Sequence, residues 1–246
     1  LSSANKESII CGWKFINNKL KKYKTNFIPL DSEHFSIWSL IKKSDYKMIS
    51  RIYLTASGGP FFNKSKNKIR NAKISDVIKH PNWNMGHKIS VDSATLMNKI
   101  FELIEASKIF NLPMNKLDII IHPKSYVHAL VNFKNGLSKM LIHETKMEIP
   151  IFNAIFSKTP EIYLKNQDIN FDNLNGYNFI KPSNSIFPLL KVINFYWKND
   201  SFFEIILVIV NDYFVEKFLD GQINFQIMQT KLLYKLKDPY LSKYYN

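Results

Sequence analysis

The fold is decided by the stretch LDIIIHPKSYVHALVNFKNGLSKMLIH, residues 117–143. Its opening, Leu117 to Ile121, is almost continuously apolar and predicts a strongly buried strand. The runs 126–133 and 137–143 flank Lys134-Asn135-Gly136, and because Asn-Gly is a strong turn signal, they predict a β-hairpin. We therefore expect a central mixed sheet that contains this hairpin.

Helical and strand patterns alternate on the N-terminal side of this stretch. The predicted helices cover 7–20, 35–42, 75–79 and 93–110, and the predicted strands cover 25–30 and 52–55. Residues 62–73 are rich in Lys and Asn and are expected to be mobile. Beyond 187 the periodicity is helical again, with Gly221 as a helix stop. The expected fold class is α/β: an α+β domain with a central mixed sheet over 1–157, a linker over 158–185, and a smaller all-helical C-terminal domain over 186–246.

The composition is that of an ordinary globular protein, with 46% hydrophobic and 22% charged residues among 246. A net charge of +14 invites a nucleic-acid interpretation, but the lysines are scattered, and the sequence has no zinc-finger spacing or aromatic-basic RNA-binding pattern. We therefore expect no nucleic-acid partner. The apolar run 205–210 is too short to span a membrane and is expected to be a buried helix segment, so no membrane partner is expected either.

Cys11 is the only cysteine, which excludes an internal disulfide and a cysteine-based zinc site. We expect it to be a small buried residue in a protein of a reducing compartment. No Gly-rich dinucleotide fingerprint or Walker loop occurs in the sequence, which contains only seven glycines.

Three carboxylates point to a metal site. Asp31 and Glu33 follow the predicted strand 25–30, and in extended backbone residues two apart project to the same side. Two such carboxylates repel unless a cation or a shared proton relieves the charge. Together with Glu102 on the predicted helix 93–110, they would suit Mg²⁺ or Mn²⁺. The alternative is an ordinary acidic turn in which Asp31 caps the following helix, with His34 as a packing or hydrogen-bonding residue.

The start of the predicted helix 93–110 suits an anion. Asp92 or Ser93 would cap it, and a helix N-terminus attracts negative charge through its free N–H groups and dipole. Ser93, Asn98 and Lys99 supply hydroxyl, amide and ammonium donors for a phosphate. The alternative is a solvated polar face with a capping serine.

Two loops could complete such a site. Ser57 precedes Gly58-Gly59, a pair that permits close approach of backbone and hydroxyl to a ligand. The loop His80-Pro81-Asn82-Trp83 offers a polar donor and a large indole that could close over a ligand as a lid. In the alternative interpretation, Trp83 anchors its loop to the core.

Taken together and in this order, these motifs resemble the 1-deoxy-D-xylulose 5-phosphate reductoisomerase family of the non-mevalonate isoprenoid pathway. The similarity is dense over residues 1–155 and thinner beyond. The matching segments are Ala4-Asn5-Lys6-Glu7-Ser8, Asp31-Ser32-Glu33-His34, Ser57-Gly58-Gly59-Pro60-Phe61, His80-Pro81-Asn82-Trp83, Met85-Gly86, Lys88 to Thr95, Met97-Asn98-Lys99 with Glu102, and Ile121-His122-Pro123 with Ser125 and His128.

The resemblance implies a role for each matching residue. The divalent metal, Mn²⁺ or Mg²⁺, would be bound by Asp31, Glu33 and Glu102. The substrate would be contacted by Lys6, Ser32, Glu33, Ser57, His80, Trp83, Ser93, Asn98, Lys99 and Glu102, among which Lys6, Glu33 and Glu102 would be catalytic. NADPH would be contacted by Asn5, Glu7, Gly86 and Met147.

The implied reaction is the NADPH-dependent rearrangement and reduction of 1-deoxy-D-xylulose 5-phosphate to 2-C-methyl-D-erythritol 4-phosphate. The resemblance also implies a homodimer in the bacterial cytoplasm, with the plastid stroma as the second choice. Family members begin with a dinucleotide-binding domain, and this chain resembles them only from its tail end onward. As an isolated fragment it is therefore expected to be inactive or weakly active.

The chain departs from the family at three places. The segment between Asp31 and Ser57 is shorter than expected, the glycine and proline usual before Met147 are missing, and Asn211-Asp212 replaces an Asn-Glu pair. The truncation and the shortened segment between Asp31 and Ser57 motivate a hypothesis from another class, a truncated non-catalytic remnant that binds phosphorylated metabolites or an oligomer partner.

Overall fold

The computed structural model describes residues 1–42, 46–83, 85–156, 159, 161–164, 171–196 and 202–245. The chain forms two compact units, each discontinuous in sequence: unit 1 comprises Leu1–Ala56 and Glu102–Lys181, and unit 2 comprises Ser57–Phe101 and Pro182–Asn246. Residues 57–101 thus group with the C-terminal helices. The division into domains expected from the sequence stays a prediction.

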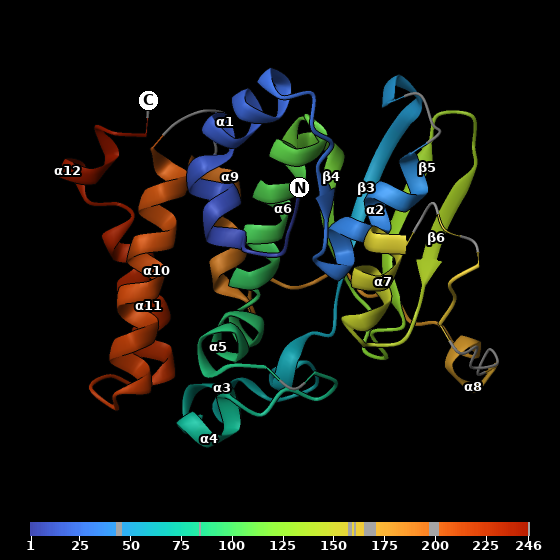
Figure 1. The fold of residues 1–246 in the computed structure, drawn as a ribbon. Coiled ribbons are helices and arrows are strands. Elements are labelled where there is room, and N and C mark those ends of the chain that lie inside the picture. The colour runs from blue at the N-terminus through green and yellow to red at the C-terminus, as the bar shows by residue number, and fades with distance from the viewer. Residues whose placement is uncertain are drawn as a thin grey trace. The chain divides into compact units, whose positions relative to one another are not determined.

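Unit 1 combines two sheets with several helices (Figure 1). Its strands are β1 (Ser2–Ser3), β2 (Ile28–Pro29), β3 (Ile49–Ala56), β4 (Leu117–Ile121), β5 (Val127–Phe133) and β6 (Ser138–Ile142). Its helices are α1 (Lys6–Lys22), α2 (Ser32–Ile41), the greater part of α6 (Met97–Phe110), α7 (Glu148–Phe156) and α8 (Phe171–Leu174), with 3₁₀ turns η1 (Tyr46–Met48) and η3 (Met114–Lys116).

The larger sheet is mixed, which confirms the predicted fold class. Its strand order is β4-β3-β5-β6, with β3 parallel to β4 and the other two neighbouring pairs antiparallel. The predicted hairpin is confirmed as β5 and β6, and Gly136 adopts φ 85° in their turn. The small sheet pairs β1 with β2 in parallel. Strand β2 ends at Pro29, two residues before Asp31.

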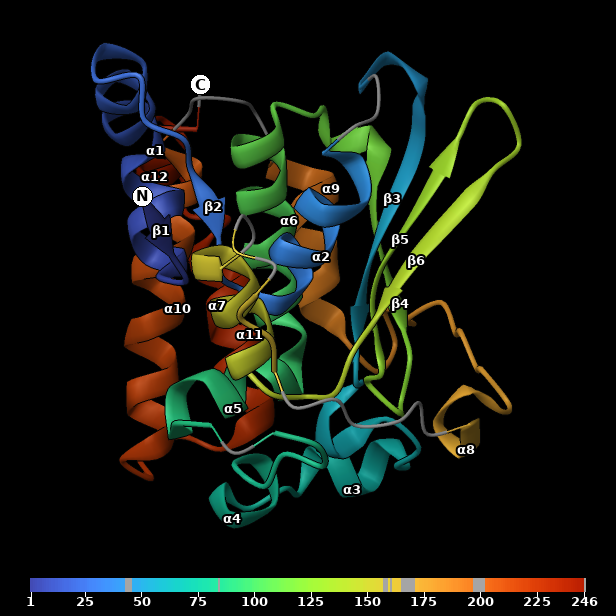
Figure 2. The ribbon, with the colours of Figure 1, turned by 45° about the vertical axis from the view of Figure 1, so that its right-hand side comes forward.

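Helix α2 covers the larger sheet and fixes the core of unit 1 (Figure 2). Its residues Ile37 and Ile41 are fully buried, as are Leu54 of β3 and Val131 of β5. Burying a side chain of this size stabilises the fold by about 1.5–3 kcal/mol. The start of α2, which carries Asp31 and Glu33, is therefore held on a rigid base.

Unit 2 is helical. Its elements are η2 (Gly59–Phe61), α3 (Lys66–Arg70), α4 (Ile74–Val77), α5 (His87–Thr95), the first turn of α6, η4 (Pro188–Leu190), α9 (Lys191–Tyr196), α10 (Phe203–Leu219), α11 (Phe225–Lys235) and α12 (Pro239–Ser242). Aromatic rings join them, since the Phe225 ring lies 5.1 Å from Phe61 and 5.7 Å from Phe218. The expected helix stop is confirmed, because α10 ends two residues before Gly221, which has φ 73°.

Several predictions of local structure were wrong. The single helix expected over 93–110 is two helices, because Leu96 adopts a left-handed conformation with φ 61° between α5 and α6. Cys11 is exposed rather than buried, because α1 turns only its first residues, with Ile9 and Ile10, into the core. Residues 62–73 contain the helix α3, and their expected mobility stays a prediction.

The linker expected over 158–185 contains regular structure where it is described. Helix α8 lies in it, and Ile180 forms an isolated antiparallel bridge with Ile121. Residues 158, 160 and 165–170 of this segment lie outside the described residues.

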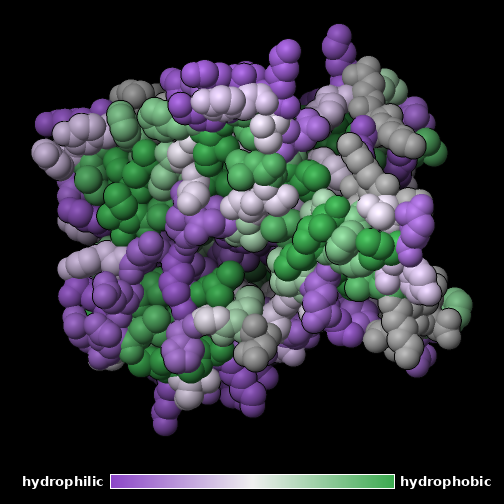
Figure 3. Space-filling view, in the orientation of Figure 1, coloured by the Kyte–Doolittle hydropathy of each residue, from purple (hydrophilic) through white to green (hydrophobic). Residues whose placement is uncertain are grey.

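No described helix combines the length and the apolar character that a membrane span needs. The buried segment expected over 205–210 lies within α10, although Ile209 is 61% exposed. On the face drawn in the space-filling view, hydrophobic side chains gather in several areas, with hydrophilic side chains between them (Figure 3).

Candidate functional site

The carboxylates Asp31 and Glu33 lie at the N-terminus of α2. Asp31 is the N-cap, and its Oδ1 accepts the Glu33 backbone N–H at 3.3 Å. The expectation of extended backbone at this point was therefore wrong, and the capping role considered as an alternative is observed. Capping does not remove Asp31 from a cation site, because a carboxylate at a helix N-terminus stays ionised and keeps further lone pairs.

Glu102 of α6 meets these two carboxylates in unit 1. Each of Asp31, Glu33 and Glu102 offers one oxygen, and the three oxygens lie within 4.8 Å of one another. Two oxygens that bind one Mg²⁺ at 2.0–2.1 Å lie at most about 4.2 Å apart. The three oxygens would therefore have to move closer together to bind one ion, and three carboxylate donors are the chemistry that a hard divalent cation prefers.

A lysine ammonium already lies among these carboxylates. Lys6 Nζ donates to Asp31 Oδ2 and lies 3.7 Å from Glu102 Oε1. Burial opposes the charge of Lys6, but the carboxylates of Asp31 and Glu102 outweigh it and hold the pKa of Lys6 well above its usual value. This part of unit 1 therefore attracts positive charge.

His34 is a second buried cation in the same group. Its Nδ1 lies 3.1 Å from Asp31 Oδ1 and its Nε2 lies 2.9 Å from the backbone oxygen of Glu102. With Asp31 ionised, both partners accept hydrogen bonds, so both ring nitrogens donate and the ring is an imidazolium. Burial opposes this charge, but the carboxylates of Glu105 and Asp31 outweigh it and raise the pKa of His34 to about 9. These contacts agree with the expectation that His34 is a hydrogen-bonding residue.

Sequence reasoning missed Glu105. Its side chain is fully buried, and its oxygens have no hydrogen-bond partner among the described residues. Burial raises the pKa of Glu105 to about 7, while His34 and Lys6 act in the opposite direction. The available signal was its position on α6, three residues after Glu102, which places both carboxylates on one side of the helix.

A second group of candidate residues lies in unit 2, around Ser57. His80 Nδ1 accepts the backbone N–H groups of Asn82 at 3.1 Å and Trp83 at 2.9 Å, so the proton is on Nε2. That Nε2–H donates to Ser57 Oγ at 3.0 Å, and Oγ also accepts the Gly59 N–H at 3.0 Å. The hydroxyl hydrogen of Ser57 is the donor that it can offer to an oxyanion.

Ser93, Asn98 and Lys99 flank the break between α5 and α6. The expectation that Ser93 begins a helix was wrong, because it lies in the last turn of α5, while Asn98 and Lys99 lie in the first turn of α6. The expectation that Asp92 caps a helix was also wrong, since Asp92 is buried within α5. The helix N-terminus that favours an anion is therefore that of α6.

The Ser57 loop packs directly on this break. A Cβ at Gly59, which has φ 62°, would lie 3.0 Å from the backbone oxygen of Ser93 and 3.1 Å from Ala94 Cα. Glycine is required there, both for its conformation and for its lack of a side chain. Lys99 is also close, because its charge adds to burial in lowering the pKa of His80 to about 4. Unit 2 thus gathers hydroxyl and ammonium donors beside a neutral imidazole.

This arrangement predicts that His80 stays neutral, with Nε2 protonated, down to about pH 5. Because its pKa of about 4 lies below the unfolded value of about 6.5, the unfolded state binds more protons between these values. His80 therefore reduces the stability of the fold as the pH falls through this window. Lys99→Met should raise the pKa of His80 only partly, since burial is the larger cause.

The measurement is a long-range ¹H–¹⁵N NMR titration, with His80→Gln to assign the signals. Lys73→Met is the control for Lys99→Met, because it removes the same charge at an exposed position in the same unit. It should leave the titration of His80 unchanged. Protonation of wild-type His80 near pH 6.5 would contradict the arrangement.

The remaining expected site residues are placed as follows. Ser32 Oγ donates to Glu33 Oε2 at 2.6 Å, and Trp83 is half-buried beside His80. Of the expected cofactor residues, Asn5 is the N-cap of α1, Glu7 lies in its first turn, Gly86 is the exposed N-cap of α5, and Met147 is half-buried just before α7.

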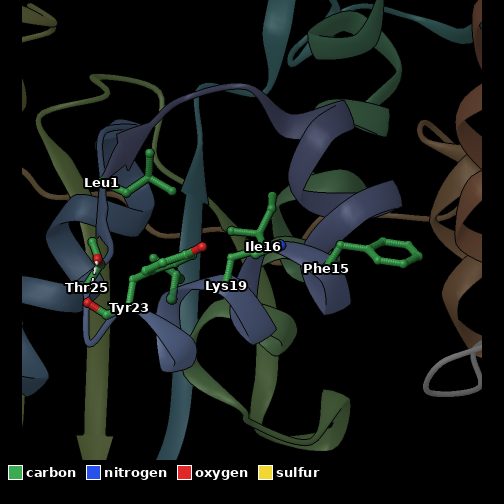
Figure 4. Close-up of a pocket in the computed structure, with 7 residues that line it drawn as sticks. Leu1, Phe15, Ile16, Lys19, Tyr23 and Thr25 are labelled. Atoms are coloured by element: carbon green, nitrogen blue, oxygen red, sulfur yellow. Dashed lines mark hydrogen bonds between the residues drawn. The ribbon is translucent and has the colours of Figure 1, made fainter.

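A shallow groove of about 440 Å³ runs along α1, and its lining includes none of the candidate site residues (Figure 4). Its lining is mostly apolar, and it includes Leu1, Phe15, Ile16, Lys19, Leu20, Tyr23 and Thr25. Lys19 is the one ionisable lysine in this lining, and no carboxylate or histidine belongs to it. The lining therefore contains no carboxylate or imidazole that could bind a metal.

Two family models match the chain. The one described as the 1-deoxy-D-xylulose 5-phosphate reductoisomerase C-terminal domain matches residues 27–110, and the one described as the DXP reductoisomerase C-terminal domain matches residues 142–240. The chain is also 52% identical over 244 residues to a 1-deoxy-D-xylulose 5-phosphate reductoisomerase of Pelagibacter ubique (strain HTCC1062), an alignment that covers 99% of this chain and 63% of that protein.

Solved structures give the same picture. A crystal structure of DOX-P reductoisomerase in complex with NADPH, fosmidomycin and magnesium matches with a TM-score of 0.89 at 31% identity, and the match covers 100% of this chain and 62% of that one. The 1-deoxy-D-xylulose 5-phosphate reductoisomerase from Zymomonas mobilis in complex with NADPH matches with a TM-score of 0.85 at 30% identity, over 95% of this chain and 60% of that one. The chain spans about three fifths of the length of these relatives.

Proposed function

This chain belongs to the 1-deoxy-D-xylulose 5-phosphate reductoisomerase family, and we propose from this premise that it serves the family's reaction. That reaction is the metal- and NADPH-dependent rearrangement and reduction of 1-deoxy-D-xylulose 5-phosphate to 2-C-methyl-D-erythritol 4-phosphate. The observation that carries the proposal is the approach of Asp31, Glu33 and Glu102 to within 4.8 Å. A remnant without catalytic function is not favoured, because the acidic group and the phosphate donors are all present.

We assign the metal to Asp31, Glu33 and Glu102. Their oxygen donors suit Mg²⁺ or Mn²⁺, and magnesium is present in a related structure. The ion, when bound, supplies a Lewis acid and a template for the vicinal oxygens of the substrate. Lys6 would donate a hydrogen bond to a substrate oxygen while negative charge develops on that oxygen. The Lys6 ammonium suits this role because it is buried and protonated at neutral pH. Lys6, Glu33 and Glu102 are thus the proposed catalytic residues.

We assign the phosphate and neighbouring hydroxyls to the donors of unit 2. These are Ser57, His80, Ser93, Asn98 and Lys99. Binding at the phosphate anchors the substrate away from the reacting bonds and so supports its orientation. Ser32 would contact the substrate beside the metal, and Trp83 would cover it and exclude water.

NADPH is the proposed hydride donor, as it is the cofactor in two related structures. The residues proposed to contact it are Asn5, Glu7, Gly86 and Met147. The amide oxygen of Asn5 already accepts the Ser8 N–H at 2.7 Å, so its contact to the cofactor would use the amide nitrogen. The chain supplies orientation and a dry site, and the cofactor supplies the hydride.

A homodimer in the bacterial cytoplasm completes the proposal. The family resemblance suggests the homodimer, the bacterial origin of the relatives supports the location, and a plastid stroma is the alternative location.

Calorimetry tests the two halves of the proposed site separately. Mn²⁺ is expected to bind with one site per chain, and 1-deoxy-D-xylulose 5-phosphate should bind more tightly when Mn²⁺ is present, with a reciprocal gain for the metal. The sugar without its phosphate is the control and should bind weakly. Mn²⁺ binding that is independent of the sugar phosphate would overturn the proposed reaction, as would the absence of Mn²⁺ binding. Consumption of NADPH by a version of the protein that includes the dinucleotide-binding domain, in the presence of both ligands, would support it directly.

A further inference from the structure

A hydrogen bond between two buried polar side chains connects α5 with α10 inside unit 2. Asn211 Nδ2 of α10 donates to Asp92 Oδ1 of α5 at 2.8 Å. Asn211 is 1% exposed and Asp92 is 2% exposed. Burial raises the pKa of Asp92, whereas Lys88 and the bond from Asn211 act to lower it. The amide of Asn211 thus faces a carboxylate that has little contact with water.

Lys88 holds the other oxygen of this carboxylate. Its Nζ lies 3.0 Å from Asp92 Oδ2 and 3.1 Å from Asp212 Oδ1. The side chains of Lys88 and Asp212 are 34% and 45% exposed, so the second contact is screened by solvent and contributes little. The bond from Asn211 is the one that fixes the direction of the Asp92 carboxylate from the interior.

Asp92 directly precedes Ser93, at the point where α5 must end. Thr95 Oγ1 donates to the backbone oxygens of Val91 and Asp92, and Met97 N–H donates to Thr95 Oγ1 at 3.3 Å. The chain then turns through the left-handed Leu96 into α6. A rotation of the last turn of α5 would therefore move both the Ser93 hydroxyl and the start of α6.

A buried polar pair such as Asp92 and Asn211 contributes little net stability to a fold. Replacing a buried ionic or polar pair by apolar residues of similar volume is often neutral or stabilising. Removal of one partner, in contrast, leaves a buried group unsatisfied. The geometry therefore suits a role in holding a defined orientation.

We propose that Asn211 is a positioning residue for phosphate binding: acting through Asp92, it sets the orientation of the last turn of α5 and so the placement of the Ser93 hydroxyl. This inference rests on the proposed phosphate-binding role of unit 2. The inference adds to the proposed phosphate site a residue of the C-terminal helices, Asn211, that need not touch the ligand.

The test exchanges the two partners. Asn211→Asp places two carboxylates against each other and removes the hydrogen bond to Asp92. A hydrogen bond to a charged group is worth about 1.5–3 kcal/mol, which corresponds to roughly 10–150-fold in an equilibrium constant. We expect affinity for inorganic phosphate, measured by ³¹P NMR titration, to fall by at least roughly 10-fold in this variant. The double variant Asp92→Asn/Asn211→Asp restores a donor and an acceptor and leaves the side chain at position 92 an oxygen for Lys88. It should recover phosphate affinity.

Two comparisons separate positioning from general stability. Gln229 is 6% exposed on α11 and its amide donates within its own helix to the Phe225 oxygen at 3.3 Å. Gln229→Ala is therefore matched to Asn211→Ala as a loss of a buried amide, and only Asn211→Ala should weaken phosphate binding. Affinity for Mn²⁺, which we assign to unit 1, should stay unchanged in all variants that circular dichroism shows to be folded.

The outcomes are distinct. A folded Asn211→Ala or Asn211→Asp protein with wild-type phosphate affinity would overturn the inference, and so would a folded double variant that does not recover it. The double variant decides the matter if the single ones do not fold. A wild-type protein that fails to bind phosphate at all would instead overturn the proposed phosphate-binding role of unit 2, and the inference with it.

Discussion

Glu102→Gln is expected to abolish metal-dependent turnover in a full-length version of the protein and to weaken Mn²⁺ binding strongly in this chain. The substitution keeps the shape of a side chain that is 1% exposed, but it removes one of three charges that approach within 4.8 Å. Loss of a mere outer-shell partner costs a metal site about 10–100-fold in affinity, so loss of a charged ligand should cost at least about 100-fold. The fold should persist, because Asp31 still neutralises Lys6.

Mn²⁺ calorimetry measures the effect, and chemical denaturation with circular dichroism checks the fold. Glu216→Gln is the matched control: it makes the same chemical change at an exposed position of α10 and should leave Mn²⁺ affinity unaltered. Near-normal Mn²⁺ affinity or turnover in Glu102→Gln would refute the metal assignment.

His34→Phe is expected to cause the largest loss of stability. The ring of His34 is fully buried and donates from both nitrogens, one toward Asp31 and one to the Glu102 backbone oxygen. Phenylalanine fills similar space but leaves the carboxylates of Asp31 and Glu105 without this cation. Breaking a buried ion pair by removing one partner costs about 3–5 kcal/mol, a large part of the stability of an ordinary domain.

Urea denaturation provides the free energy of unfolding for this comparison. His87→Phe makes the same change at an exposed position of α5 and should alter it by less than about 0.5 kcal/mol. If His34→Phe is as stable as the wild type, the imidazolium assigned here is wrong, and a proton on Asp31 must take its place.

Much of the secondary structure could be predicted because its causes are local. The hairpin of β5 and β6 follows from Asn135-Gly136 between two apolar runs, and α10 stops before Gly221 for the same kind of reason. The break at Leu96 could not be predicted in this way. No glycine or proline marks it, and it depends on the Thr95 hydroxyl, which bonds both to the end of α5 and to the start of α6.

In the candidate site, too, some features could be predicted from the sequence and others depended on tertiary contacts. The residue types alone indicated that Asp31, Glu33 and Glu102 suit a cation, but the physical reason given for two of them was wrong, since they converge at a helix N-terminus and not along a strand. Glu105 was missed, because its significance depends on full burial against His34 and Lys6.

By itself, the sequence determined the family, the alternation of helices and strands, and the chemistry that its polar residues can perform, because these depend on residue type and on spacing within a few turns. Only the tertiary structure decided which of those residues meet: Asn211 and Asp92 are 119 positions apart and share a buried hydrogen bond. Such an encounter is set by the path of the whole chain through its core, and no short window of sequence contains that path.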